Sequence, residues 1–316
     1  MSPTETDADA ASPFRGILLK VTSVAIFMGM TACIKAVSTT IPPGEMVFFR
    51  SFFALPPILI WLAFLGELRT GLRVRDGWGH LWRGLVGGAS MALMFAALAY
   101  LPLTEVVAIT YAAPLFVTIL AAMFLNESIR LYRLAAVALG MVGVAIILSP
   151  RLSIGTEVTT DAQAFGALLA LFAAVLMALA MVFVRKLVRT ETTSAIVFWF
   201  SVTCTLLALL TLPFGWPIPT WEEAALLIMA GLLGGTAQIF LTSAYRHAEV
   251  GVIAPFEYTS MLLAIAVGWF LFGEAPTGIV LAGAALIATG GILIIWRERQ
   301  LGLERAKAKP AKGMPG

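Results

Sequence analysis

Residues 164–186 read AFGALLALFAAVLMALAMVFVRK, with no charged side chain before Arg185. A helix needs about 20 apolar residues to cross a hydrocarbon core of about 30 Å, so this stretch is long enough to span a membrane. Stretches of similar length and composition recur along the chain from Phe14 to Trp296. The chain is 60% apolar and 12% charged, whereas soluble proteins are roughly 25% charged. The sequence therefore predicts an all-α integral membrane protein with many spans.

Apolar runs separated by charges, proline and glycine predict ten transmembrane helices. They lie near residues 15–38, 45–66, 79–99, 104–125, 132–149, 164–186, 192–212, 221–243, 251–272 and 277–296. With a cytoplasmic N-terminus, nearly all Lys and Arg residues fall on the cytoplasmic side, Lys20 and Arg83 among them. Lys35 and Arg151 then lie outside and Arg50 within a span. The positive-inside rule places both termini in the cytoplasm, as expected of a bacterial inner-membrane protein.

The two halves of the chain resemble each other. LNES at 125–128 aligns with FGEA at 272–275, which pairs Glu127 with Glu274, and the same offset pairs Tyr111 with Tyr258. VFFRS at 47–51 aligns with VFWFS at 197–201 and places Arg50 opposite Phe200. Because five is odd, a duplicated five-helix unit crosses the membrane in opposite directions in its two copies. The sequence therefore predicts two inverted-topology five-helix repeats with a binding site between them.

These boundaries divide the chain into five segments. We expect a polar cytoplasmic N-terminus over residues 1–14, a first repeat over 15–150, a periplasmic linker over 151–163, a second repeat over 164–297, and a basic cytoplasmic tail over 298–316. The tail is rich in Lys, Ala and Pro, a composition typical of disordered segments that associate with anionic lipid headgroups.

Three stretches carry a family resemblance: FFRSFFALPP at 48–57, LPLTEVVAITYAAPLFVTILAAMFLNE at 101–127, and HAEVGVIAPFEYTSMLLAIAVGWFLFGEAP at 247–276. Over about residues 15–297 the sequence resembles the EamA type of the drug/metabolite transporter superfamily, with ten spans and two repeats. The last stretch resembles the branch that includes S-adenosylmethionine and riboflavin carriers. The resemblance implies a small-molecule substrate that is amino-acid-like, S-adenosylmethionine-like or flavin-like, and an arginine near position 50.

An ionised side chain at the centre of a span costs about 2.5–3.5 kcal/mol, so Arg50, Glu105 and Glu257 each require a reason. The planar fork of Arg50 suits a substrate carboxylate or a pairing glutamate, and Phe200 at the equivalent position favours a role in binding or gating. The alternative is a snorkelling arginine. Glu257 can pair with a cationic substrate or take up a proton, or it can stabilise a helix N-terminus. Glu105 has the same two interpretations.

Tyrosine and glutamine side chains add further candidates for substrate binding. Tyr111 and Tyr258 occupy equivalent positions and could form two aromatic walls for a planar solute, although packing alone would also explain them. Gln238 lies within a span, where it could line a cavity or form a hydrogen bond between helices.

Three further residues are candidates for a hinge or gate. Pro114 cannot donate to the carbonyl of Thr110, so it is expected to kink its helix. Glu127 and Glu274 fall at helix ends on opposite sides of the membrane, where each could cap the following helix or close a gate.

Together these features favour a secondary transporter that moves a small amphipathic metabolite by alternating access, with Arg50 and Glu257 orienting the substrate. The alternatives are a flippase acting on lipid headgroups and an intramembrane enzyme.

HExxH, GxSxG, P-loop and Cys/His-cluster motifs do not occur in the sequence, so we expect no catalytic residue, metal or cofactor. The net charge of +3 reflects topology, and we expect no nucleic-acid partner. Membrane lipids are expected partners, protons are a candidate coupling ion, and the chain could be a monomer or a homodimer.

Overall fold

The computed structural model describes residues 13–68, 71–125, 131–152, 161–188, 190–247 and 254–308. Within these residues the chain forms helices and no strand. Six of their helices are long and apolar enough to cross a membrane, and four more apolar helical segments are shorter. The long ones are Phe14–Val37, Pro43–Phe64, Gly77–Tyr100, Asp161–Val184, Thr193–Phe214 and Trp221–Ala244, and the shorter ones are Leu103–Val117, Val137–Pro150, Phe256–Phe272 and Gly278–Leu293.

The first half of the chain contains seven helices in its described residues, because two predicted spans are broken. The helices are α1 (Pro13–Val37), α2 (Pro43–Phe52), α3 (Leu55–Phe64), α4 (Gly77–Tyr100), α5 (Leu103–Thr110), α6 (Ala113–Leu125) and α7 (Leu131–Leu152). The break between α2 and α3 precedes Pro56 and Pro57, which have no backbone N–H to continue the helix. Pro114 acts in the same way at the start of α6, so the helix is interrupted at Tyr111 and Ala112 rather than only bent.

The second half contains α8 (Asp161–Leu187), α9 (Thr193–Leu209), the 3₁₀ turn η1 (Leu212–Phe214), α10 (Trp221–His247), the 3₁₀ turn η2 (Ala254–Tyr258), α12 (Thr259–Phe272) and α13 (Gly278–Ala308). Glu257 therefore lies in a 3₁₀ turn before α12 and not within the α-helix expected over 251–272.

The last helix corrects the prediction of a disordered tail. Helix α13 continues to Ala308, past the end expected near residue 296. Residues 297–308 read RERQLGLERAKA, and Arg, Glu, Gln, Leu, Ala and Lys are all strong helix formers. Residues 309–316 lie outside the described part of the chain.

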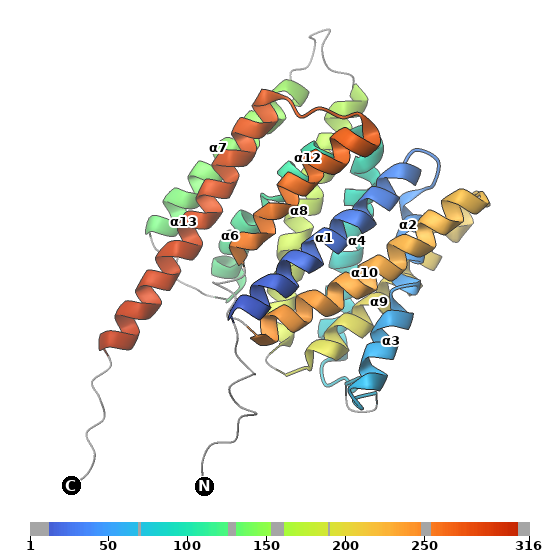
Figure 1. The fold of residues 1–316 in the computed structure, drawn as a ribbon, viewed down its shortest axis with the longest axis horizontal. Helices are drawn as coiled ribbons and strands as arrows, with labels where there is room; N and C mark the ends of the chain where they lie inside the picture. Colours follow the sequence, from blue (N-terminus) through green and yellow to red (C-terminus); the bar gives the residue numbers. More distant parts are fainter. Residues whose placement is uncertain are drawn as a thin grey trace.

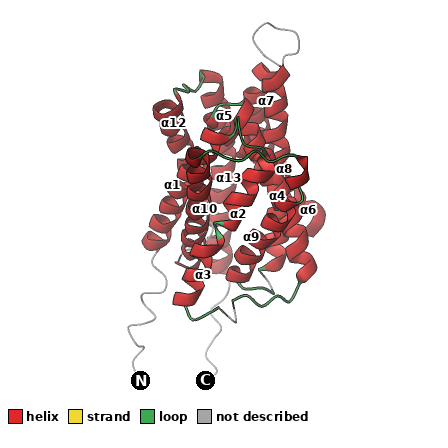
Figure 2. Ribbon diagram, turned by 90° about the vertical axis from the view of Figure 1, so that its right-hand side faces the viewer, coloured by secondary structure: helices red, strands yellow, loops and turns green. Residues whose placement is uncertain are grey.

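The helices pack in pairs that join the two halves (Figures 1 and 2). Helix α1 packs along α10, α4 along α8, α2 against α9, and α7 along α13. The contact between α7 and α13 is close because Gly143 faces the backbone of Gly283. A Cβ added to Gly143 would lie only 2.6 Å from the carbonyl oxygen of Gly283. The start of α1 and the end of α13 lie toward the same end of the molecule (Figure 1).

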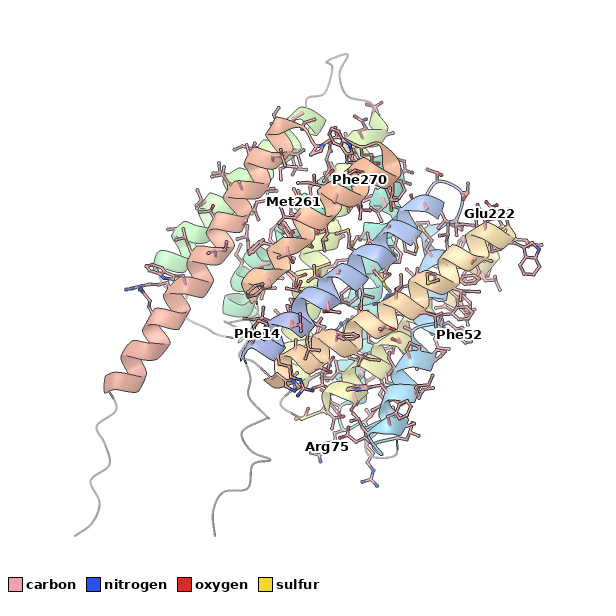
Figure 3. All side chains as sticks on the ribbon, in the orientation of Figure 1. Phe14, Phe52, Arg75, Glu222, Met261 and Phe270 are labelled. Carbon is pink, nitrogen blue, oxygen red and sulfur yellow. The ribbon has the colours of Figure 1, made fainter. Side chains whose placement is uncertain are left out.

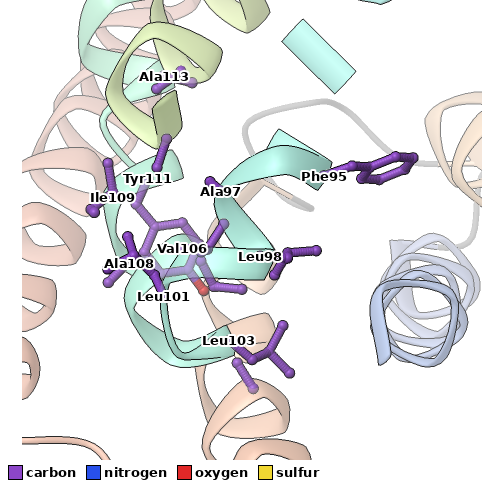
Figure 4. Packing of buried hydrophobic residues seen from close by; sticks show 14 of the residues in the cluster. Phe95, Ala97, Leu98, Leu101, Leu103, Val106, Ala108, Ile109, Tyr111 and Ala113 are labelled. Atoms are coloured by element: carbon purple, nitrogen blue, oxygen red, sulfur yellow. The ribbon is translucent and has the colours of Figure 1, made fainter. Parts of the chain in front are cut away.

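Apolar side chains cover both the inside and the outside of the bundle. In the interior, Phe95 and Leu98 of α4 belong to the same buried apolar cluster as Leu103 and Val106 of α5, part of which Figure 4 draws. On the outside, Phe270 is 82% exposed and Phe14 75% exposed, and both are marked in Figure 3. So much exposed apolar surface is compatible with lipid as the surrounding solvent and would be unfavourable in water.

Candidate substrate site

Two arginines flank the ring of Phe200 inside the bundle. Helix α2 carries Arg50, which is 6% exposed and whose guanidinium carbon lies 6.0 Å from the centroid of the Phe200 ring. Helix α4 carries Arg83, whose guanidinium carbon lies 3.9 Å from the same centroid. The Nε atom of Arg50, and Nε and Nη1 of Arg83, are buried and have no hydrogen-bond partner among the described residues. The site therefore holds two cations beside one aromatic ring, Arg83 in closer contact than Arg50, and several unused donors.

Arg83 is one of two residues, with Lys20, that the sequence interpretation missed because they were counted among the cytoplasmic charges. Arg83 falls within the span predicted over 79–99, and the structure likewise places it in α4. Asp76 caps this helix, because its Oδ1 accepts a hydrogen bond of 2.9 Å from the N–H of Gly79. A signal was present in RGLVGG at 83–88. Gly87 leaves space for the arginine, because a Cβ there would come within 2.2 Å of Arg83 Nη1 and 2.9 Å of the Phe200 ring.

A partly buried ion pair connects Lys20 of α1 with Glu257 of η2. The Lys20 side chain is 4% exposed and that of Glu257 is 53% exposed. Lys20 had been counted as a charge at the cytoplasmic surface, but it lies in the interior, where a cation requires a counter-ion. In this conformation the cation that Glu257 binds is thus a lysine of the same chain.

A second ion pair lies near the other end of α1. Lys35 Nζ is 3.1 Å from Glu274 Oε1 and also donates to the carbonyl oxygens of Leu98 and Leu101, at 2.8 and 2.7 Å. Glu274 Oε2 accepts a hydrogen bond of 2.7 Å from the N–H of Leu103, the first residue of α5. Glu274 therefore caps α5 of the first half.

The sequence had suggested that Glu274 would either cap the helix that follows it or close a gate, and the structure does not show the first of these. The chain instead turns at Gly273, whose φ of +66° is in the left-handed region, and this turn follows the end of α12. The hydroxyl of Thr277 accepts a hydrogen bond of 3.4 Å from the N–H of Val280 near the start of α13. Glu274 is consequently left to join α1, α5 and the end of α12.

Tyr111 and Tyr258 meet in space, although they lie far apart in the sequence. Their ring centroids are 5.2 Å apart and their planes meet at 72°, an edge-to-face contact. The Tyr111 hydroxyl is hydrogen-bonded to that of Ser260 at 2.6 Å. The Tyr258 hydroxyl reaches α13 at Gly291, where an added Cβ would lie only 1.6 Å from it. The two rings thus touch each other, and no open space separates them in this conformation.

The remaining predicted site residues occupy separate places in the fold. Glu105 is 3% exposed and lies in the first turn of α5. Gln238 lies on α10 and is partly buried, and Pro114 lies in the first turn of α6. Glu127 lies outside the described residues. Within the described residues no group of three or more His, Cys, Asp or Glu side chains is arranged to hold a metal ion.

Long apolar helices packed as a bundle with charged side chains inside it form the fold of a membrane transporter. The chain belongs to the EamA-like transporter family, which matches it twice, over residues 14–149 and 164–296. This match confirms the resemblance seen in the sequence. The protein is accordingly a multi-pass membrane transporter and not an enzyme.

Individual proteins with similar sequences are also transporters. The riboflavin transporter of Rhizobium johnstonii is 32% identical over 272 residues, which cover 85% of each chain. The pseudopaline exporter CntI of Pseudomonas aeruginosa is 30% identical over 282 residues, covering 88% of this chain and 95% of the exporter. The S-adenosylmethionine uptake transporter of Rickettsia conorii is 26% identical over 268 residues, covering 84% of this chain and 87% of the transporter.

A solved crystal structure has the same fold. It aligns with a TM-score of 0.63 at 20% sequence identity and covers 92% of this chain and 100% of its own. At this identity the likeness concerns the fold alone.

Proposed function

We propose that the protein is a secondary transporter that moves a small amphipathic organic metabolite across a bacterial inner membrane by alternating access. We further propose that ten helical spans form two inverted five-helix repeats, residues 15–150 and 164–297. The six long and four shorter apolar helices support this number. The relatives named for riboflavin, pseudopaline and S-adenosylmethionine support a small organic solute as the substrate.

The observation that carries the proposal is that residues paired by the repeat meet in space. Tyr111 contacts Tyr258, and Arg50 lies beside Phe200. In an inverted repeat a pseudo-two-fold axis lies in the membrane plane, and only equivalent residues close to that axis can touch. Two such contacts support an axis in the interior of the bundle, where transporters of this architecture bind their substrates.

Helix packing supports the same symmetry. If each half contributes five spans, α1 against α10 pairs the first span with the eighth, and α4 against α8 pairs the third with the sixth. If each span is exchanged for its equivalent in the other half, the contact of the first span with the eighth becomes the contact of the sixth with the third. The contacts of α2 with α9 and of α7 with α13 each join two equivalent spans, so the exchange leaves them unchanged. A structure with this exchange symmetry has two equivalent asymmetric states, open to opposite sides.

The two ion pairs of α1 are suited to be the gates of such a cycle. Lys20 and Lys35 are about 22 Å apart along the helix at about 1.5 Å per residue, so their pairs lie at different depths. In the proposed topology the pair of Lys35 with Glu274 closes the periplasmic side, and the pair of Lys20 with Glu257 closes the cytoplasmic side. Both pairs are formed here, as expected of an occluded state.

The proposed orientation places both termini in the cytoplasm and the segment 151–163 in the periplasm. Arg75 and Glu222 are exposed and mark opposite ends of the bundle in Figure 3. Single cysteines at these positions should react with a membrane-impermeant maleimide from opposite sides of the membrane. Labelling of both from one side would exclude the proposed topology.

Transport is tested in proteoliposomes that contain the full chain. Uptake and efflux of S-adenosylmethionine, riboflavin and amino acids are measured with and without a pH gradient, which also tests protons as the coupling ion. We expect saturable flux that Arg50→Ala and Glu257→Gln reduce. Arg75→Ala and Glu222→Gln are the matched controls, because they remove the same charges from exposed positions. Flux that is unaffected by both test variants would remove Arg50 and Glu257 from the substrate site.

A further inference from the structure

The buried charges of the protein are unevenly matched. Of the charges on α1, Lys20 pairs with Glu257 and Lys35 pairs with Glu274. Arg50 and Arg83 form no ion pair with any described residue, and their guanidinium groups repel each other. Arg50 is buried, and Arg83 is partly buried with its Nε and Nη1 atoms inside the protein. A cation held away from water without a counter-ion is costly, and two adjacent ones are more so.

Contact with Phe200 compensates only part of this cost. A cation over an aromatic ring is stabilised by about 0.5–2 kcal/mol, less than the roughly 2.5–3.5 kcal/mol for inserting one arginine at the centre of a span. The ring also leaves the N–H groups at the edge of each guanidinium unused, as the three unpaired nitrogen atoms show. Oxygen atoms of an anion are the ligands that these N–H groups require.

Glycine residues on neighbouring helices leave room for the side chains of the two arginines. Gly87 of α4 lies one turn after Arg83, and its lack of a side chain accommodates Arg83 Nη1 and the Phe200 edge. Gly234 of α10 does the same for Arg50, because a Cβ there would lie 3.2 Å from Arg50 Nε. Three helices thus contribute to the positive site, and a fourth, α9, supplies the aromatic ring.

We propose that Arg50 and Arg83, which lie beside Phe200, form a subsite for an oxyanion, a carboxylate or phosphate group of the substrate. This inference rests on the proposed transport function and defines its substrate class as anionic at one end. It also reassigns the acidic candidate: Glu257 is matched by Lys20 and serves closure, whereas the unmatched charge at Arg50 and Arg83 attracts the substrate. The oxyanion could belong to a dissolved metabolite or to a lipid headgroup.

Binding is tested on the purified full-length chain in phosphatidylcholine nanodiscs. Thermal unfolding is followed while inorganic phosphate or citrate is titrated at constant ionic strength set with chloride. We expect both oxyanions to raise the unfolding temperature of the wild-type protein. In Arg83→Gln we expect binding to weaken by about tenfold or more, the fold-change for losing a charge-assisted hydrogen bond. Arg75→Gln is the matched control and should retain wild-type binding.

Two further variants separate the subsite from general effects on folding. Arg83→Lys keeps the charge but not the fork, so intermediate binding is expected. Gly87→Ala keeps both arginines but displaces the Arg83 guanidinium, so binding should weaken although no charge is removed. If Gly87→Ala and Arg83→Gln both bind phosphate and citrate as the wild type does, the subsite is refuted.

The lipid source is distinguished by nanodiscs that contain phosphatidylglycerol and no soluble oxyanion. Stabilisation there that depends on Arg83 supports the subsite with a headgroup as its ligand. Stabilisation only by phosphate or citrate supports it with a dissolved ligand. Absence of both effects overturns it. Oxyanion binding without saturable flux in proteoliposomes would refute the transport function and support the subsite. Saturable flux that is insensitive to Arg83→Gln would support the transport function and refute the subsite.

Discussion

Replacing Glu274 by Gln removes the negative charge that holds the proposed periplasmic gate closed. A glutamine can still accept the hydrogen bond from the N–H of Leu103, and Lys35 can still donate hydrogen bonds to the carbonyl oxygens of Leu98 and Leu101. What is lost is the charge contribution to a pair in which the side chains are 13% and 19% exposed. A hydrogen bond to a charged group contributes about 1.5–3 kcal/mol, so the closed-to-open ratio should fall roughly 10- to 150-fold.

The opening is measured with a cysteine placed directly behind the gate. Thr104 is 0% exposed and follows Leu103, and its hydroxyl has no hydrogen-bond partner, so Thr104→Cys is a conservative reporter. In a background with Cys33→Ala and Cys204→Ala, a membrane-impermeant methanethiosulfonate is added to right-side-out vesicles. While the closed state predominates, the labelling rate follows the open fraction and should rise by the same factor in Glu274→Gln.

Glu222→Gln removes an equivalent charge from an exposed position of α10 and should leave the labelling rate unchanged. A rate in Glu274→Gln that equals the rate of the Thr104→Cys parent would show that the ion pair does not control access. An increase with the reagent on the cytoplasmic side only would refute the assigned orientation of the gate.

Three further predictions follow from individual contacts. Glu257→Gln should lower the unfolding temperature more than Lys20→Met does. It leaves a cation that is 4% exposed without a partner, whereas Lys20→Met leaves a half-exposed carboxylate; equal losses would contradict this ion pair. Gly143→Ala should destabilise the protein by about 1–3 kcal/mol through overpacking against Gly283, while Gly278→Ala, with open space around it, serves as the control in the same denaturation experiment. Tyr111→Phe should cost about 1 kcal/mol in unfolding free energy by removing the hydrogen bond to Ser260 while retaining the ring contact, and a loss as large as that in Tyr111→Ala would contradict this assignment.

Much of the fold could be predicted from the sequence because hydrophobic length is a local property. Each apolar stretch must satisfy its own backbone hydrogen bonds in a membrane, so it becomes a helix wherever the surroundings allow. The stretches that carried the family resemblance lie within the two regions that match the EamA-like transporters. The boundaries were less predictable. Proline divided the second and fourth predicted spans, and the strong helix formers after Trp296 prolonged α13.

The sequence by itself determined a multi-pass transporter of the EamA type, and it identified Arg50, Tyr111, Tyr258 and Glu274 as unusual residues within it. Only the tertiary structure decided what these residues contact. Charge patterning placed Lys20 and Arg83 at the membrane surface because a count along one dimension cannot distinguish a lysine near a helix end from one buried beside a glutamate. The pairs of Lys20 with Glu257 and of Arg83 with Phe200 join residues more than a hundred positions apart. Such partners are selected by the packing of helices from both halves, and no local pattern records that packing.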